Sequence, residues 1–278
     1  MRTPEKQLNL RLRHPDYQKF LDINEHESER VKKHYRCYLD QKYGKAALQT
    51  LDIFPANIRG APILVFIHGG YWRALDKKSY GFVAAPFVEN DMTVCVVNYR
   101  LIPTVNMEML LNDIKDVINW IQKEAFQYNG DPGAMILSGH SAGGHLALMS
   151  YLMNEGLRSS IQAICSLSGI FDLAPIKNSY LNEVLQLDEN DVENFSVINQ
   201  DLSAIKCPVL LSVGSDETDF FIGQSRNLYT ENRSRAPIEY YEYKQLNHYQ
   251  IVHKLGQEDS PLVNFILGKM NNKECNKK

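Results

Sequence analysis

The sequence predicts one α/β domain with a mostly parallel central sheet and helices on both of its faces. Short, continuous apolar segments alternate with longer segments in which apolar residues recur every three or four positions, and this alternation is typical of such a sheet. The length of 278 residues suits a single large domain of this class. The hydrophobic content of 44% and the charged content of 23% are those of an ordinary globular protein.

The N-terminal residues 1–44 are polar and charged, and we interpret them as a helical segment that caps one side of the domain. Within it, residues 28–41 are predicted to form an exposed helix whose basic residues face the solvent. The α/β domain then occupies residues 45–270. The polar tail, residues 271–278, is predicted to be disordered.

Seven segments of the main domain have the composition of strands. Most are short, continuous and apolar, as expected for strands that are buried on both faces, whereas the first and the last alternate between apolar and polar residues. The predicted strands are residues 48–54, 62–67, 92–97, 134–137, 161–167, 209–213 and 238–243.

Helical patterns lie between these strands. The clearest is residues 107–124, where the apolar residues fall on one helix face. The other predicted helices are residues 80–89, 142–152 and 222–231. Residues 172–193 form a connection that is too long for a simple loop, and we predict that it folds into the short helices of a small cap.

Charge and cysteine content argue against several classes of function. The formal net charge of −3 gives no electrostatic reason to expect nucleic acid or an anionic membrane as a partner. The absence of an apolar leader and of any apolar run long enough to span a bilayer predicts a cytoplasmic protein. Five cysteines without C-x-x-C spacing and eight histidines without ligand spacing predict no disulfide framework and no metal site. We expect a small-molecule substrate and no cofactor, and a homodimer stays open.

The clearest functional motif is the pattern Gly-His-Ser-Ala-Gly at positions 139–143, which joins a predicted strand to a predicted helix. A G-x-S-x-G pattern in this place is typical of a nucleophile elbow, in which small flanking residues let the backbone turn sharply and present the serine hydroxyl above the sheet edge. We therefore predict that Ser141 is a catalytic nucleophile. The alternative is a tight turn without chemistry.

A second glycine-rich turn, His-Gly-Gly-Tyr-Trp at positions 68–72, directly follows a predicted strand. Because glycines lack side chains, the N–H groups of Gly69 and Gly70 can approach a substrate closely. A serine nucleophile needs such donors, fixed before the reaction, for the oxyanion of the transition state, and the N–H of Ala142 adds another. These residues predict an oxyanion hole. The alternative is a plain glycine turn.

The general base is expected near the C-terminus, because the order in this architecture is serine, acid, histidine. His248 lies just beyond the last predicted strand, where loops present catalytic groups. His253 follows in a helix-like segment, and we interpret it as an ordinary helix surface residue. We therefore predict His248 as the base.

The acid is expected after the preceding strand, residues 209–213. Three carboxylates follow it closely: Asp216, Glu217 and Asp219. Either Asp or Glu can accept the histidine N–H, set its tautomer and stabilise the imidazolium. At least one of the three is expected to serve only as a first-turn acid that complements the dipole of the next helix.

Four motifs together resemble α/β-hydrolases of the arylformamidase (kynurenine formamidase) group, which is related to the hormone-sensitive-lipase-like carboxylesterases. The resemblance covers the chain from about Tyr43 to Leu262, and it implies the α/β-hydrolase fold. The motifs are His-Gly-Gly-Tyr-Trp at 68–72, Val-Asn-Tyr-Arg-Leu at 97–101, Gly-His-Ser-Ala-Gly-Gly-His at 139–145 and Leu-Asn-His-Tyr at 246–249.

The resemblance also implies roles for individual residues. Ser141 takes the position of the nucleophile and His248 that of the base. Members of the family place the acid three residues after a glycine, and counting from Gly214 puts Glu217 there. Asp216 is adjacent and stays the alternative acid.

The implied activity is that of a serine hydrolase. It would cleave a small acyl group from an aryl formamide such as N-formylkynurenine, or from a short-chain ester, through an acyl-enzyme. Tyr71 and Trp72 are predicted to contact the aryl group, with core packing as the alternative for Trp72. A general short-chain carboxylesterase without formamidase activity is the main alternative function, and a non-catalytic ligand-binding relative is the other.

Overall fold

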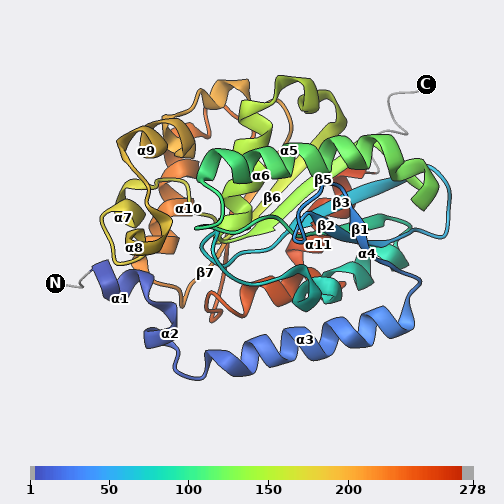
Figure 1. Ribbon diagram of the computed structural model, residues 1–278, viewed down its shortest axis with the longest axis horizontal. Coiled ribbons are helices and arrows are strands. Elements are labelled where there is room, and N and C mark those ends of the chain that lie inside the picture. Colours follow the sequence, from blue (N-terminus) through green and yellow to red (C-terminus); the bar gives the residue numbers. More distant parts are fainter. Residues whose placement is uncertain (1–3, 271–278) are drawn as a thin grey trace.

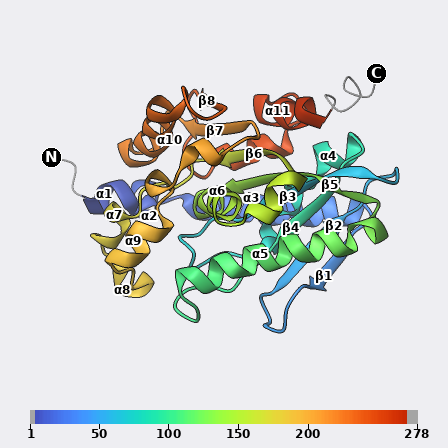
Figure 2. The ribbon, with the colours of Figure 1, turned by 90° about the horizontal axis from the view of Figure 1, so that it is seen from above.

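The computed structural model describes residues 4–270, so the predicted disordered tail, residues 271–278, lies outside the described residues. At its centre is an eight-stranded sheet with the order β1-β2-β4-β3-β5-β6-β7-β8 (Figures 1 and 2). The strands are β1 (Tyr38–Lys42), β2 (Thr50–Phe54), β3 (Ala61–Ile67), β4 (Thr93–Val97), β5 (Gly130–His140), β6 (Ile161–Leu167), β7 (Val209–Gly214) and β8 (Ile238–Tyr243).

The sheet is parallel from β4 to β8, and β2 is antiparallel to both β1 and β4. The predicted mostly parallel α/β-hydrolase architecture is therefore confirmed. Because β3, β5 and β7 run in the same direction, their carboxyl ends lie on the same side of the sheet. The glycine turn after β3, the serine turn after β5 and the acidic loop after β7 are therefore neighbours at these carboxyl ends.

The central strands are buried on both faces, which explains their continuous apolar sequences. Along β3, Ile63, Val65 and Ile67 belong to one core cluster, whereas Leu64 and Phe66 belong to a second cluster on the opposite face. This alternation follows from the two-residue period of a strand. Helices cover both clusters, with α5 above the sheet and α3 below it in Figure 1.

The longer helices belong to the parts of the chain where apolar residues recur with helical spacing. Helix α5 (Met107–Glu124) has the predicted bounds, and α6 (Ala142–Met153) follows the serine turn directly. The remaining helices of the main domain are η1 (Lys77–Ala84), α4 (Ala85–Glu89), η2 (Ala125–Tyr128), η3 (Glu155–Ser160), α7 (Ala174–Lys177), α8 (Asn182–Leu185), α9 (Glu189–Phe195), η4 (Val197–Asn199), η5 (Leu202–Ala204), α10 (Asp219–Asn232), η6 (Ile251–Gly256) and α11 (Pro261–Met270).

Two of the predicted helices differ from the structure. The helix predicted over residues 28–41 is wrong in its second half: α3 (Tyr17–His34) ends earlier, and β1 then pairs antiparallel with β2 at the sheet edge. Pairing with that open edge outweighs the local helix propensity. The helix predicted over residues 80–89 consists instead of the 3-10 helix η1 followed by one short α-helix, α4.

The N-terminal segment folds against the main domain. Helix α3 is only partly exposed, since Phe20, Ser28 and Val31 are buried. The two short helices before it, α1 (Pro4–Leu8) and α2 (Leu10–Arg13), lie at the same end of the molecule as α7 and α8 in both views (Figures 1 and 2). Within residues 4–270, no helix combines the length and the apolar character needed to cross a bilayer.

Candidate active site

The serine turn between β5 and α6 has a strained backbone. Ser141 adopts φ 56° and ψ −118°, a conformation that non-glycine residues rarely take and that often occurs at functional sites. Its N–H is held by the carbonyl oxygen of Leu167 at 2.7 Å. A Cβ at Gly139 would lie 2.2 Å from the carbonyl oxygen of Gly143, and a Cβ at Gly143 would lie 2.0 Å from that of Ile67. The turn therefore requires both glycines.

His248 and Glu217 form a buried pair on the loops after β8 and β7. Nδ1 of His248 lies 2.6 Å from Oε2 of Glu217, and the two side chains are 5% and 0% exposed. The other oxygen, Oε1, accepts hydrogen bonds from the Ser168 hydroxyl at 2.5 Å and from the N–H of Gly214 at 2.8 Å. Because these donors hold the carboxylate from the far side, Glu217 can orient the imidazole and stabilise its charged form.

The two other candidate acids do not contact His248. Asp216 and Asp219 are both exposed. The backbone carbonyl of Asp216 accepts a hydrogen bond from Arg13, and the N–H of Glu217 donates to the carbonyl oxygen of Gly214 at 3.2 Å. This tight turn directs the Glu217 side chain inward. Asp219 is the first residue of α10, as expected for a first-turn acid.

Ser141 and His248 line the same cavity, which has a volume of about 480 Å³, within the range of small-molecule sites. The Ser141 hydroxyl makes no hydrogen bond with residues 4–270, a common state in a site without substrate. His253, interpreted above as a helix surface residue, is only partly exposed, because its ring packs near Phe82 with centroids 5.5 Å apart, so that interpretation is wrong. His253 does not line this cavity.

The glycine turn after β3 places backbone N–H groups beside Ser141. A Cβ at Gly69 would lie 3.1 Å from Cβ of Ser141, and Gly70, with φ +107°, lines the cavity. The Tyr99 hydroxyl donates to the carbonyl oxygen of His68 at 2.8 Å. Since C=O and N–H point in opposite directions in a trans peptide, the N–H of Gly69 points away from Tyr99.

The third predicted donor, the N–H of Ala142, belongs to the first residue of α6. The first N–H groups of a helix have no partner within the helix and carry its positive dipole end. Ala142 itself is fully buried and follows Ser141 directly, so its N–H lies at the base of the serine side chain.

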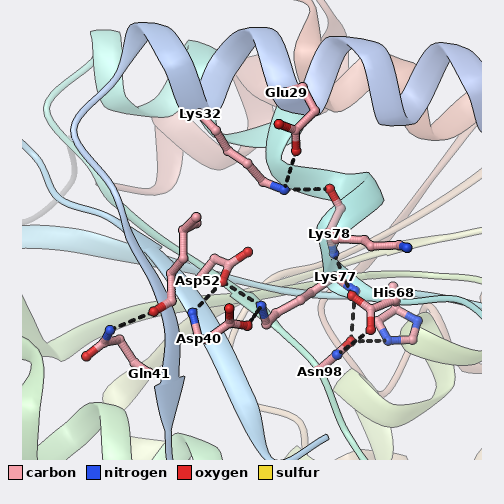
Figure 3. Close-up of polar contacts among 11 residues, drawn as sticks. Glu29, Lys32, Asp40, Gln41, Asp52, His68, Lys77, Lys78 and Asn98 are labelled. Atoms are coloured by element: carbon pink, nitrogen blue, oxygen red, sulfur yellow. Dashed lines mark hydrogen bonds and ion pairs between the residues drawn. The ribbon is translucent and has the colours of Figure 1, made fainter.

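A buried polar network supports the glycine turn from behind (Figure 3). Nε2 of His68 lies 3.0 Å from Oδ1 of Asn98, and the same oxygen accepts the N–H of Lys77 at 2.7 Å. The ammonium group of Lys77 then donates to Asp52 at 2.6 Å and to Asp40 at 2.7 Å. The network therefore connects the turn after β3 to η1 and to the strands β1 and β2.

The ion pair in this network is deeply buried, since the side chains of Lys77 and Asp52 are 4% and 2% exposed. Burial alone would lower the pKa of Lys77, but its hydrogen bonds to Asp40 and Asp52 outweigh burial and raise that pKa. The amine is therefore charged at neutral pH. Removing it would leave the carboxylate of Asp52 buried without its counter-ion.

We therefore expect Lys77→Met to lower the free energy of unfolding by about 3 to 5 kcal/mol, because breaking a buried pair costs more than the pair contributes. Urea unfolding followed by circular dichroism measures this change. The exposed neighbour Lys78 offers a matched control, and Lys78→Met is expected to change the free energy by less than about 0.5 kcal/mol. Equal, small changes in the two variants would contradict a structural role for the pair.

The two aromatic residues predicted to contact substrate have different positions. Tyr71 lines the cavity, and its hydroxyl donates to the carbonyl oxygen of Leu8 at 2.8 Å. Trp72 does not line it: the side chain is fully buried and packs edge-on against His145. The backbone of both residues has positive φ, and this turn directs the indole into the core. The predicted substrate contact of Trp72 is therefore corrected to core packing.

Two further residues, Ser168 and His140, make contacts in the site that no sequence motif indicates. Ser168 lies at the carboxyl end of β6, so the strand order indicates its position, but only the structure shows its bond to Glu217. His140 places Nε2 2.9 Å from the carbonyl oxygen of His248, and burial holds the pKa of His140 well below its ordinary value. The described residues contain no group of three or more His, Cys, Asp or Glu placed to hold a metal ion.

Comparison with known proteins places the chain among hydrolases. The BD-FAE family model matches residues 51–229. A kynurenine formamidase of Danio rerio is 28% identical over 252 residues, which cover 86% of this chain and 84% of the relative. Esterase LipQ of Mycobacterium tuberculosis is 26% identical, over 71% of this chain and 51% of the esterase. These matches confirm the resemblance seen in the four motifs.

The fold is also shared with solved structures. The hyperthermophilic esterase of the archaeon Pyrobaculum calidifontis superimposes with a TM-score of 0.74 and 15% sequence identity, over 92% of this chain and 94% of the esterase. At this identity the likeness concerns the fold, and it agrees with the α/β-hydrolase architecture described above.

Proposed function

Because the chain belongs to the BD-FAE family and is a hydrolase, we propose that it is a serine hydrolase in which Ser141, His248 and Glu217 act as nucleophile, base and acid. The observation that carries this proposal is the buried pair of His248 and Glu217 together with the strained serine turn, because Ser141 and His248 line the same cavity. Asp216 is not part of the proposed site.

The proposed reaction has two steps. In the first, Nε2 of His248 takes the proton of the Ser141 hydroxyl while Oγ attacks the substrate carbonyl, and the N–H groups of Gly69, Gly70 and Ala142 stabilise the oxyanion. His248 then gives that proton to the leaving nitrogen or oxygen, and an acyl-enzyme remains. In the second step, His248 takes a proton from water, the hydroxide attacks the acyl carbon, and Ser141 leaves with its proton restored.

The proposed substrates are an aryl formamide, such as N-formylkynurenine, and short-chain esters. Support for an aryl group comes from the cavity, whose lining includes the rings of Tyr17, Tyr71, Tyr80, Tyr180 and Tyr249. Aromatic side chains of this kind pack well against an aromatic leaving group. The formamidase relatives support the formamide, and the esterase relatives support a general short-chain carboxylesterase as the second candidate.

We also propose that the N-terminal segment, residues 1–44, is the cap of this cavity. Its described part contributes Leu8, Leu10 and Tyr17 to the cavity lining. It is held in place by the Thr218 hydroxyl, which donates to the carbonyl oxygen of Gln7 at 2.9 Å. A cap that excludes water would favour acyl transfer to serine over side reactions.

One preparation assayed with two substrates tests the function. We expect p-nitrophenyl acetate to be hydrolysed faster than longer acyl esters and N-formylkynurenine to be cleaved, with kcat/KM as the measurement and Ser141→Ala as the blank. Turnover of the acetate alone would leave a carboxylesterase. No turnover of either, together with no labelling by a fluorophosphonate, would leave a non-catalytic ligand-binding protein.

A further inference from the structure

The cavity beside Ser141 has a positive charge that the proposed reaction does not use. Its lining contains two guanidinium groups, those of Arg11 and Arg73, and no aspartate or glutamate. The whole chain has a formal net charge of −3, so this lining differs in sign from the protein around it. A cavity lined by one sign of charge attracts ligands of the opposite sign.

Arg73 is positioned by the same turn that carries the glycine N–H groups. Its N–H donates to the carbonyl oxygen of Gly70 at 3.1 Å, and the two residues between them, Tyr71 and Trp72, have φ of 50° and 57°. Because the side chain of Trp72 is fully buried in the core, the backbone of the adjacent Arg73 is held next to the site. Burial raises the pKa of Tyr71 and of Tyr180, and the negative charges of Glu217 and Glu5 add to that rise at Tyr71 and Tyr180, respectively. The positive charge of Arg73 opposes the rise at both phenols, which places this charge near both rings.

The Arg73 side chain is half-buried but has no partner within residues 4–270. Other arginines with restricted exposure do have partners. Arg100 forms an ion pair with the buried Asp113, and Arg158 donates to the carbonyl oxygens of Tyr151 and Leu152. Burying a charge without a partner costs free energy, and a ligand that supplies the counter-charge would recover that cost.

Arg11 lies at the rim of the same cavity. Its side chain is exposed, and the guanidinium carbon lies 4.9 Å from the centre of the Tyr17 ring. This stacking orients the guanidinium group while leaving its N–H donors free to bind a ligand. Within the described residues it forms no ion pair with a carboxylate. Arg11 therefore adds positive charge at the entrance, whereas Arg73 adds it inside.

We infer that Arg73, assisted by Arg11, binds a carboxylate of the substrate, so that the preferred substrates are aryl formamides or esters that carry a carboxylate. This inference rests on the proposed function for the part that reacts at Ser141. A guanidinium group is planar and offers paired N–H donors that match the two oxygens of a carboxylate. Binding at Arg73 would hold the aryl group in the cavity while its acyl group lies at Ser141.

Pairs of esters that differ only in charge test the inference. The pairs are 3-acetoxybenzoate with 3-acetoxybenzamide, and 3-(3-acetoxyphenyl)propanoate with its primary amide, which place the carboxylate at two distances from the ester. We expect kcat/KM for at least one carboxylate to exceed that of its amide about tenfold or more, mainly through KM, since a charge-assisted hydrogen bond is lost with the amide. In Arg73→Gln this ratio is expected to fall to about one, and Arg73→Lys should keep part of it.

Arg226→Gln is the control for the loss of an arginine, because Arg226 pairs with Glu242 on the exposed part of α10 and does not line the cavity. For Arg226→Gln, the ratio of kcat/KM for the carboxylate to kcat/KM for the amide should equal the wild-type ratio. A wild-type ratio near one for both pairs, or an unchanged ratio in Arg73→Gln, would overturn the inference. The proposed function would still stand if the amides are hydrolysed and Ser141→Ala abolishes that turnover.

A binding measurement covers the case in which no ester is hydrolysed. Isothermal titration calorimetry with 3-phenylpropanoate and 3-phenylpropanamide compares the two charge states without any reaction. We expect the wild type to bind the carboxylate about tenfold or more tightly than the amide, and Arg73→Gln to bind both alike. Equal binding by the wild type would overturn the inference, whatever the outcome of the assays at Ser141.

Discussion

Replacing Ser141 by alanine is expected to lower kcat for p-nitrophenyl acetate by about 10³-fold or more, because the members of a catalytic triad act as a unit. Alanine removes only the hydroxyl, which makes no hydrogen bond within residues 4–270. The strained backbone at this position depends on Gly139 and Gly143, which stay unchanged. The variant should therefore fold normally, and circular dichroism with urea unfolding would show whether it does.

Ser150 provides a matched control for this change. It lies in α6, the helix that follows Ser141, it is buried, and its hydroxyl has no hydrogen-bond partner among the described residues. Ser150→Ala is expected to keep turnover and fluorophosphonate labelling close to those of the wild type. If Ser141→Ala also kept near-wild-type turnover, the turn between β5 and α6 would have only a structural role.

The sequence was sufficient to predict seven of the eight strands of the sheet and the position of the serine turn, since both depend on local patterns. Continuous apolar strands alternate with helical segments, and the glycines at 139 and 143 flank a serine between a strand and a helix. The edge strand β1 was not predictable in this way. Its sequence suits a helix, and only the neighbouring β2, which offers an unpaired edge, decides its conformation.

Sequence reasoning from composition did not settle which carboxylate lies against His248. Three carboxylates occur within four positions, and composition alone does not tell which side chain points inward. Family resemblance favoured Glu217, and in the structure this residue lies against His248 while Asp216 is exposed. The burial of Trp72 was equally hard to predict, because it follows from positive φ at two consecutive non-glycine residues.

The sequence motifs also did not indicate which residues of the N-terminal segment line the cavity. Leu8, Arg11 and Tyr17 lie more than a hundred positions before Ser141 in the chain. They line its cavity because the N-terminal segment packs across the loop after β7 and across Tyr249 in the loop after β8. Contacts of this kind depend on tertiary packing between segments that share no local pattern. The charge pattern of the cavity is therefore a property of the fold.

Replacing Glu217 by glutamine is expected to lower kcat/KM by about 10³- to 10⁴-fold, because a histidine without its carboxylate partner takes the wrong tautomer. In the structure Oε1 of Glu217 accepts two donors, from Ser168 and Gly214, so a glutamine would keep its carbonyl oxygen there. Its NH₂ group would then face Nδ1 of His248. Nδ1 would become the acceptor, and Nε2 would carry the ring proton, so Nε2 could not take the proton of the Ser141 hydroxyl.

Asp216→Asn is the matched control, since it makes the same chemical change one position earlier. Asp216 is exposed and its side chain does not contact His248, so only a distant charge is lost. We expect kcat/KM to fall by less than about tenfold, and less still at high salt, because exposed charges are screened. The measurement is kcat/KM for p-nitrophenyl acetate at two ionic strengths. A larger loss in Asp216→Asn than in Glu217→Gln would assign the acid to Asp216, and equal, small losses would show that neither carboxylate orients His248.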